Sequence, residues 1–147
     1  MPVVNFHLLA GHSTAEQEQR LLVEASRLYS EVLGSPIERV RAFITPYPAS
    51  QFAVAGQPCS VNGLHAPFFE FIVLDGRPLA ERQRLAEGFT DLLVSILGVR
   101  RELVRGRCQR VAPEDWSIGG VPASVQRAGE VAARAAVAAG EGSGREA

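Results

Sequence analysis

The sequence contains no lysine, so all fifteen of its basic residues are arginine. Without a side-chain amine, the chain cannot form a lysine Schiff base, anchor pyridoxal phosphate or use the lysine of a phosphate-binding P-loop. No apolar run approaches the roughly 20 residues that cross a bilayer, and the first residues lack the pattern of a signal peptide. The two cysteines, Cys59 and Cys108, form no CxxC pair. We therefore expect free thiols, a cytoplasmic location and no membrane partner.

Other absences narrow the function. The net charge of −1 lacks the basic excess typical of nucleic-acid binding, so no nucleic-acid partner is expected. The three histidines, His7, His12 and His65, have no metal-ligand spacing to another His, Cys or acidic residue. No Ser, His and acidic group suggests a catalytic triad. What is present is a chain of 147 residues that is 46% hydrophobic, which is enough for a packed core.

The two halves of the chain are similar in sequence. Residues 2–11 (PVVNFHLLAG) recur as residues 67–76 (PFFEFIVLDG), 65 positions later. One residue is then dropped, and the match continues to Pro58, which pairs with Pro122. A match of this length with one indel indicates an internal repeat.

Each half is expected to form a β-α-β unit, with an apolar strand, a helix with one apolar stripe and a second strand. Glycines are expected to end both helices, and Ser13 with Glu16 is typical of a capping box. Two such units predict an α+β fold with α/β layers: a four-stranded sheet with two helices on one face. The other face is expected to be buried by oligomerisation.

The expected division has four parts. The first unit spans residues 2–58, a linker spans 59–66, the second unit spans 67–123, and the C-terminal tail spans 124–147. The tail is rich in Ala, Gly, Glu and Arg, which predicts helix over its first part and a disordered polar end after residue 139.

Pro2 is the first candidate for chemistry. Met before a small residue is usually removed, which would expose the secondary amine of Pro2 at the start of an apolar strand. An α-amino group has a pKa of about 7.7–8, and both desolvation and nearby arginines disfavour its cation. A free-base amine near neutral pH suits general base catalysis. Pro67 occupies the matching place but has an amide nitrogen, and the plainer interpretation of Pro2 is a residue without a special role.

Arginines are the second group of candidates. Arg77 follows a glycine turn, and Arg41 and Arg105 occupy matched strand positions. Arginine is suited to a planar, bidentate grip on a carboxylate. The alternative, a solvated surface arginine, is expected for most of the fifteen, including Arg127 and Arg134.

Two aromatic residues also match between the halves. Phe52 and Trp116 each come just before a turn that contains glycine. They are predicted either to lie in the core or an interface, or to form an apolar wall that lowers the pKa of the amine.

Three segments carry a family resemblance. Residues 2–11, residues 33–41 (LGSPIERVR) and residues 113–120 (PEDWSIGG) together resemble the tautomerase superfamily, specifically its 4-oxalocrotonate tautomerase group. The chain is similar to two of these short chains fused, over residues 2–123. The resemblance implies the tautomerase (MIF-like) fold, an amino-terminal proline base and no cofactor. Because six units form a hexamer in the family, it also implies a homotrimer of fused chains.

The resemblance implies roles for individual residues. Pro2 would move a proton between oxygen and carbon of a small carboxylate substrate, a 2-hydroxydienoate such as 2-hydroxymuconate. Arg77 would bind a carboxylate or the dienolate oxygen. Arg41 or Arg105, from a neighbouring subunit, would grip the distal carboxylate, and Trp116 would pack against the site.

The departures from the family pattern suggest an asymmetric site. In the first half the turn arginine is replaced by His12, which would serve only Pro67. Fused dehalogenases of this superfamily carry a helix histidine where this chain has Tyr29, which disfavours hydration chemistry. Two alternatives stay open: a decarboxylase or hydratase/dehalogenase that acts on a short unsaturated carboxylic acid, and a non-catalytic binding protein that retains the fold.

Overall fold

Four strands form one sheet in the computed structural model, which describes residues 2–145 and the side chains through residue 140. The strand order is β2-β1-β5-β6. β1 and β2 are parallel, β5 and β6 are parallel, and β1 pairs with β5 antiparallel. The predicted sheet of two repeated units is therefore confirmed. The strands are β1 (Val3–Leu9), β2 (Arg41–Tyr47), β5 (Phe68–Leu74) and β6 (Arg105–Val111).

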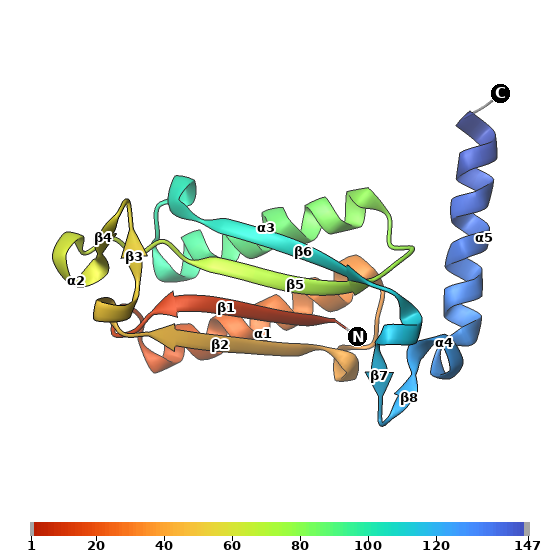
Figure 1. Cartoon of the computed structure of the whole chain (residues 1–147), viewed down its shortest axis with the longest axis horizontal. Coiled ribbons are helices and arrows are strands. Elements are labelled where there is room, and N and C mark those ends of the chain that lie inside the picture. The colour runs from red at the N-terminus through yellow and green to blue at the C-terminus, as the bar shows by residue number, and fades with distance from the viewer. Residues whose placement is uncertain (1, 146–147) are drawn as a thin grey trace.

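Two long helices, α1 (Ala15–Leu33) and α3 (Leu79–Leu97), cover one face of this sheet (Figure 1). Their apolar stripes meet the inward side chains of β1 and β5 in one core. Both helices end at a left-handed glycine, Gly34 with φ 62° and Gly98 with φ 68°, because glycine adopts this conformation without a Cβ penalty. The predicted helix ends are confirmed.

The capping box of α1 begins one residue later than predicted. Thr14, not Ser13, is the N-cap, since its extended backbone aims the side chain at the free amides of the first turn. The Gln17 amide donates to Thr14 Oγ1 (3.1 Å), and the Thr14 amide donates to Gln17 Oε1 (2.9 Å). Ser13 instead donates its hydroxyl to Glu18, and Glu16 takes no part in the box.

The core contains a cluster of aromatic rings. Tyr29 and Phe89, from the two long helices, lie with ring centroids 5.4 Å apart, and Phe89 also meets Phe71 at 5.3 Å. Gly106 in β6 makes room for this cluster, because a Cβ there would lie 2.1 Å from the ring of Phe69. The missing side chain thus lets β6 pack close to the aromatic core.

No helix of the described residues covers the other face of the sheet (Figure 1). His7 lies on it, with Nε2 2.9 Å from Glu70 Oε1, Nδ1 2.7 Å from the Tyr47 hydroxyl and its ring stacked on Phe68. Phe43 is 50% exposed on the same face. The face thus combines polar contacts with exposed apolar surface.

Small elements lie at the two ends of the sheet, and a long helix, α5 (Ala128–Arg145), stands at the end where the chain begins (Figure 1). The helix continues past residue 139, where the sequence predicts a disordered end; residues 146–147 lie outside the described residues. None of the described helices is long and apolar enough to span a membrane. The small elements are β3 (Ala53–Val54), β4 (Gln57–Pro58), α2 (Cys59–Asn62), β7 (Ser117–Ile118), β8 (Val121–Pro122), α4 (Ala123–Gln126), and the 3-10 helices η1 (Ile37–Arg39), η2 (Ala49–Gln51), η3 (Arg101–Leu103) and η4 (Pro113–Asp115).

Candidate active site

Pro2 and Pro67 occupy equivalent positions at opposite ends of the sheet. The Arg41 amide donates to the Pro2 carbonyl (2.8 Å), and the Arg105 amide donates to the Pro67 carbonyl (3.1 Å). Because β1 and β5 are antiparallel, these two pairs lie far from each other along the strands. Within one chain, Arg41 therefore accompanies Pro2, whereas Arg105 lies at the other end.

The structure brings Arg77 to Pro2. The antiparallel register pairs Val3 with Ile72, so the residues that follow β5 pass beside the start of β1. Pro2 is buried, and it lines a cavity of about 10 Å³ together with Arg77, Arg39 and Arg134. That volume is at the lower limit for one water molecule. A buried proline thus lies in a small, arginine-lined cavity.

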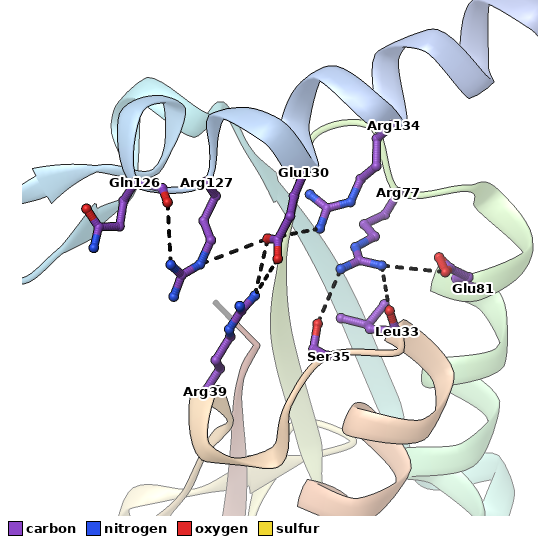
Figure 2. A network of polar contacts seen from close by, with 9 residues as sticks. All are labelled: Leu33, Ser35, Arg39, Arg77, Glu81, Gln126, Arg127, Glu130 and Arg134. Atoms are coloured by element: carbon purple, nitrogen blue, oxygen red, sulfur yellow. Dashed lines mark hydrogen bonds and ion pairs between the residues drawn. The ribbon is translucent and has the colours of Figure 1, made fainter.

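Arg77 is held firmly in this place (Figure 2). Its side chain is 12% exposed, its Nη1 donates to the Leu33 carbonyl (2.8 Å), and its Nη2 donates to Ser35 Oγ (3.3 Å). Burial and the neighbouring Arg134 lower the pKa of Arg77, while the carboxylates of Glu81 and Glu130 oppose this shift. A guanidinium still keeps its proton at neutral pH. Arg77 therefore supplies a fixed positive charge beside Pro2.

The structure adds an ionic cluster that the sequence did not reveal (Figure 2). Arg39 Nη1 donates to both carboxylate oxygens of Glu130, at 3.1 and 3.2 Å. Arg127 and Arg134 each approach Glu130 Oε2 at 3.9 Å. The prediction that Arg127 and Arg134 are solvated surface residues is wrong, since their side chains are 23% and 21% exposed. The i,i+3 and i,i+4 spacings of Arg127 and Arg134 to Glu130 could have predicted these two ion pairs. Nothing in the local sequence connects Glu130 with Arg39.

Trp116 also lies at the Pro2 end. It lines an open groove of about 370 Å³ together with Val3, Arg39, Arg41 and Arg127. Arg39 lines both this groove and the cavity of Pro2, so its side chain borders the two spaces. The groove is within the size range of small-molecule sites.

The counterparts from the first half gather at the opposite end of the sheet. Phe52 packs against Tyr47, the last residue of β2, at a centroid distance of 5.9 Å. The ring of His12 lies 5.7 Å from that of His65, whose Nε2 accepts from the Leu9 amide (3.2 Å). Burial, and next the charge of His12, lower the pKa of His65, which favours the neutral ring that this bond needs. His12 thus lies at the end of the sheet opposite to Pro2.

The hydroxyl of Tyr29 connects two strands next to Pro2. Its hydroxyl donates to the Ile72 carbonyl and lies 3.4 Å from the Val3 carbonyl, so it ties β5 to β1 next to Pro2. Burial strongly raises the pKa of Tyr29, so the hydroxyl stays protonated. At this position of α1, Tyr29 thus supplies a hydrogen-bond donor that stabilises the sheet.

The described residues contain no group of three His, Cys, Asp or Glu side chains that could hold a metal ion. Cys59 and Cys108 are free thiols, as predicted. A buried proline beside a fixed guanidinium charge is an arrangement that suits proton transfer on an anionic substrate.

Comparison with known proteins identifies the family of the chain. The family model described as "Tautomerase enzyme" matches residues 2–62. The 2-hydroxymuconate tautomerases of Pseudomonas fluorescens and Pseudomonas putida are each 42% identical over 60 residues, which cover 41% of this chain and 94% of theirs. The chain belongs to the tautomerase family and is an enzyme of the isomerase class.

Solved structures extend the similarity to both units. A native fused 4-OT has a TM-score of 0.77 at 23% identity, over 84% of this chain and 97% of that one. Macrophage migration inhibitory factor of Toxoplasma gondii has a TM-score of 0.69 at 17% identity, over 82% and 98%. The predicted fold, a fused pair of 4-oxalocrotonate tautomerase-like units, is confirmed.

Proposed function

We propose that this tautomerase uses Pro2, exposed by loss of Met1, as the general base for isomerisation of a 2-hydroxydienoate such as 2-hydroxymuconate. Met1 itself lies outside the described residues. The observation that carries the proposal is the burial of Pro2 in one cavity with Arg77, Arg39 and Arg134. Burial and the positive charge of these arginines both disfavour a prolinium cation, and the Glu130 carboxylate in the same wall partly offsets the second effect.

The reaction needs one proton to move from oxygen to carbon. The Pro2 nitrogen takes the proton of the substrate 2-hydroxyl, which leaves a dienolate with its charge on the oxygen. Arg77, held at a fixed place by Leu33 and Ser35, stabilises that charge as it develops. Prolinium then returns the proton to a carbon of the chain, giving the unsaturated 2-oxo acid and the free amine.

A substrate with two carboxylates needs a second cationic contact. Arg41 lines the groove with Trp116 at the Pro2 end of the same chain, whereas Arg105 lies beside Pro67. Arg41 is therefore the candidate within one chain, and Arg105 would have to come from a neighbouring subunit. Trp116 supplies the apolar wall in either case.

We also propose that the chain forms a homotrimer. The uncovered sheet face, with Phe43 50% exposed, favours a partner surface. Fused 4-OT structures with TM-scores of 0.74 to this chain are described as symmetric and asymmetric trimers. A stable monomer in solution would contradict this assembly.

The function is tested by comparing two prolines. Intact mass first checks that Met1 is absent, and conversion of 2-hydroxymuconate is then followed by its ultraviolet absorbance. Pro2→Ala replaces the rigid secondary amine by a primary amine, so kcat/KM is expected to fall by up to the roughly 100-fold that a general base usually contributes. Pro67→Ala is the matched control, because its nitrogen is an amide at the equivalent strand position.

The absence of lysine allows an independent check. Once Met1 is lost, Pro2 carries the molecule's single amine, so an amine-selective reagent modifies one place. Inactivation in step with that label supports the proposal. Retained Met1, no turnover by the wild type, or equal losses in the two proline variants would each refute it.

A further inference from the structure

Two charged side chains of helix α5 contact the rest of the chain: Glu130 pairs with Arg39, and Arg134 lies beside Gly76. The helix begins directly after Arg127 and stands beside the end of the sheet where Pro2 lies (Figure 1). An open space of about 440 Å³ lies beside this contact and is lined in part by Gly76 and Val137. Val137 itself is 59% exposed. A helix with so little packed apolar surface depends on its polar contacts for its position.

Those contacts converge on one carboxylate. Both carboxylate oxygens of Glu130 accept from Nη1 of Arg39, and Oε2 lies 3.9 Å from both Arg127 and Arg134 (Figure 2). Glu130 also acts on Arg77, since its charge opposes the lowering of the pKa of Arg77. One negative group is thus surrounded by several positive ones, and a charge-assisted hydrogen bond of this kind is stronger than a neutral one.

One hydrogen-bond donor of the cluster has no acceptor in the part of the chain that the structure describes and could bind an anion. Nε of Arg127 is buried and has no hydrogen-bond partner among the described residues, because Glu130 Oε2 is 3.9 Å away. A buried donor without a partner is costly. A carboxylate that entered from the neighbouring groove, which Arg127 and Arg39 also line, could accept from it.

Glu130 also limits access to Pro2. The cavity that contains Pro2 has a volume of about 10 Å³, and Glu130 and Arg134 are part of its wall. The groove on the other side of Arg39 has about 370 Å³. A muconate-sized molecule fits the groove but not the cavity, so the Arg39–Glu130 pair in the cavity wall has to open before it reaches Pro2.

We propose that Arg39, Arg127 and Arg134 form a carboxylate-binding subsite beside Pro2, and that Glu130 occupies it as an internal ligand. The distal carboxylate of a dicarboxylate substrate, which Arg41 contacts from the same groove, displaces Glu130 from these arginines, and α5 acts as the lid that this exchange opens. The identity of the substrate rests on the proposed function. Two parts of the inference do not rest on the proposed function: Glu130 occupies the arginines, and it competes there with any dicarboxylate.

The competition has a measurable consequence. While Glu130 occupies the subsite, an external carboxylate binds only to those molecules in which the subsite is free. The apparent affinity for that carboxylate is therefore multiplied by the free fraction. Glu130→Gln keeps the shape of the side chain and removes its charge. Because Arg39 and Glu130 are 26% and 43% exposed, the ion pair is screened by solvent, and we expect a gain in dicarboxylate affinity of about five-fold.

The experiment measures binding without turnover. cis,cis-Muconate, a dicarboxylate without the 2-hydroxyl, is titrated into the full chain, and the fluorescence of Trp116, the single tryptophan, reports occupancy of the groove that it lines. Sorbate, with one carboxylate and the same number of carbons, is the matched ligand. Glu87→Gln, on an exposed part of α3, is the matched variant.

The expected pattern is specific. Glu130→Gln tightens muconate binding about five-fold, changes sorbate binding less, and Glu87→Gln changes neither. Arg39→Gln weakens muconate binding and abolishes the gain from Glu130→Gln in the double variant. Equal muconate affinities in the wild type and Glu130→Gln, or muconate binding by neither protein, would overturn the subsite. A wild type that does not convert 2-hydroxymuconate, while Glu130→Gln still binds muconate more tightly, would refute the proposed function and leave the subsite intact.

Discussion

Arg77→Ala and His12→Ala test whether the two ends of the sheet differ in function. These residues occupy equivalent turns of the two halves. Arg77 shares a cavity with Pro2, whereas His12 lies beside His65 at the opposite end. We expect the first substitution to impair the enzyme strongly and the second to have almost no effect.

The magnitudes follow from the contacts of each side chain. Loss of a fixed charge that faces a developing oxyanion lowers kcat about 10²–10³-fold. Loss of the charged hydrogen bond from Arg77 to Leu33 costs about 1.5–3 kcal/mol of stability. His12 is exposed, and besides its ring contact with His65 it has one long polar contact, 3.3 Å from Nδ1 to the Ala10 carbonyl, so its removal changes stability by less than about 0.5 kcal/mol.

The assay must separate activity from folding. Urea denaturation followed by circular dichroism gives the free energy of unfolding of each variant, and kcat and KM are measured where each is fully folded. Arg77→Lys serves as a rescue variant, because it keeps the charge and loses the planar fork that contacts Leu33 and Ser35. It should recover part of kcat.

Similar losses of kcat in Arg77→Ala and His12→Ala would refute the asymmetric site. A normal kcat in Arg77→Ala with only lowered stability would show that Arg77 is purely structural.

Two further predictions concern stability. Tyr29→Phe keeps the ring in the core and removes the hydroxyl that bonds the Ile72 carbonyl, so the free energy of unfolding should fall by about 1–3 kcal/mol in urea titrations; an unchanged value would show that this bond adds nothing. Because the pKa of His65 is lowered in the folded chain, the unfolded chain binds more protons below the unfolded pKa of about 6.5, and stability should decline as the pH falls through that value. His65→Asn should flatten this decline between about pH 7 and pH 5, and an equally steep decline in the variant would assign it to other groups.

Several features of the fold could be predicted because they depend on neighbouring residues. The apolar stripes of the helices and the glycines that end them are local patterns, and both helices end where expected. The capping box was shifted by one residue, because Ser13 and Thr14 are chemically similar and only the backbone turn decides which one caps. Where two neighbouring residues could both cap a helix, the sequence alone does not predict the exact first residue of that helix.

The candidate site was only partly predictable. Pro2, Arg77 and Trp116 were found because the repeat and the family resemblance single them out. Arg39 has no counterpart in the second half, where Leu103 stands, and its partner Glu130 is 91 residues away. No periodicity or spacing connects two such residues.

By itself, the sequence determined the two β-α-β units, the place of each long helix and the absence of any lysine amine that could compete with Pro2. Only the tertiary structure decided which residues meet at Pro2. The antiparallel register of β1 and β5 brings Arg77 to it, and the position of α5 adds Glu130 to the arginines around it. The physical reason is that local propensity acts over a few residues, whereas contacts between distant segments are set by how whole elements pack.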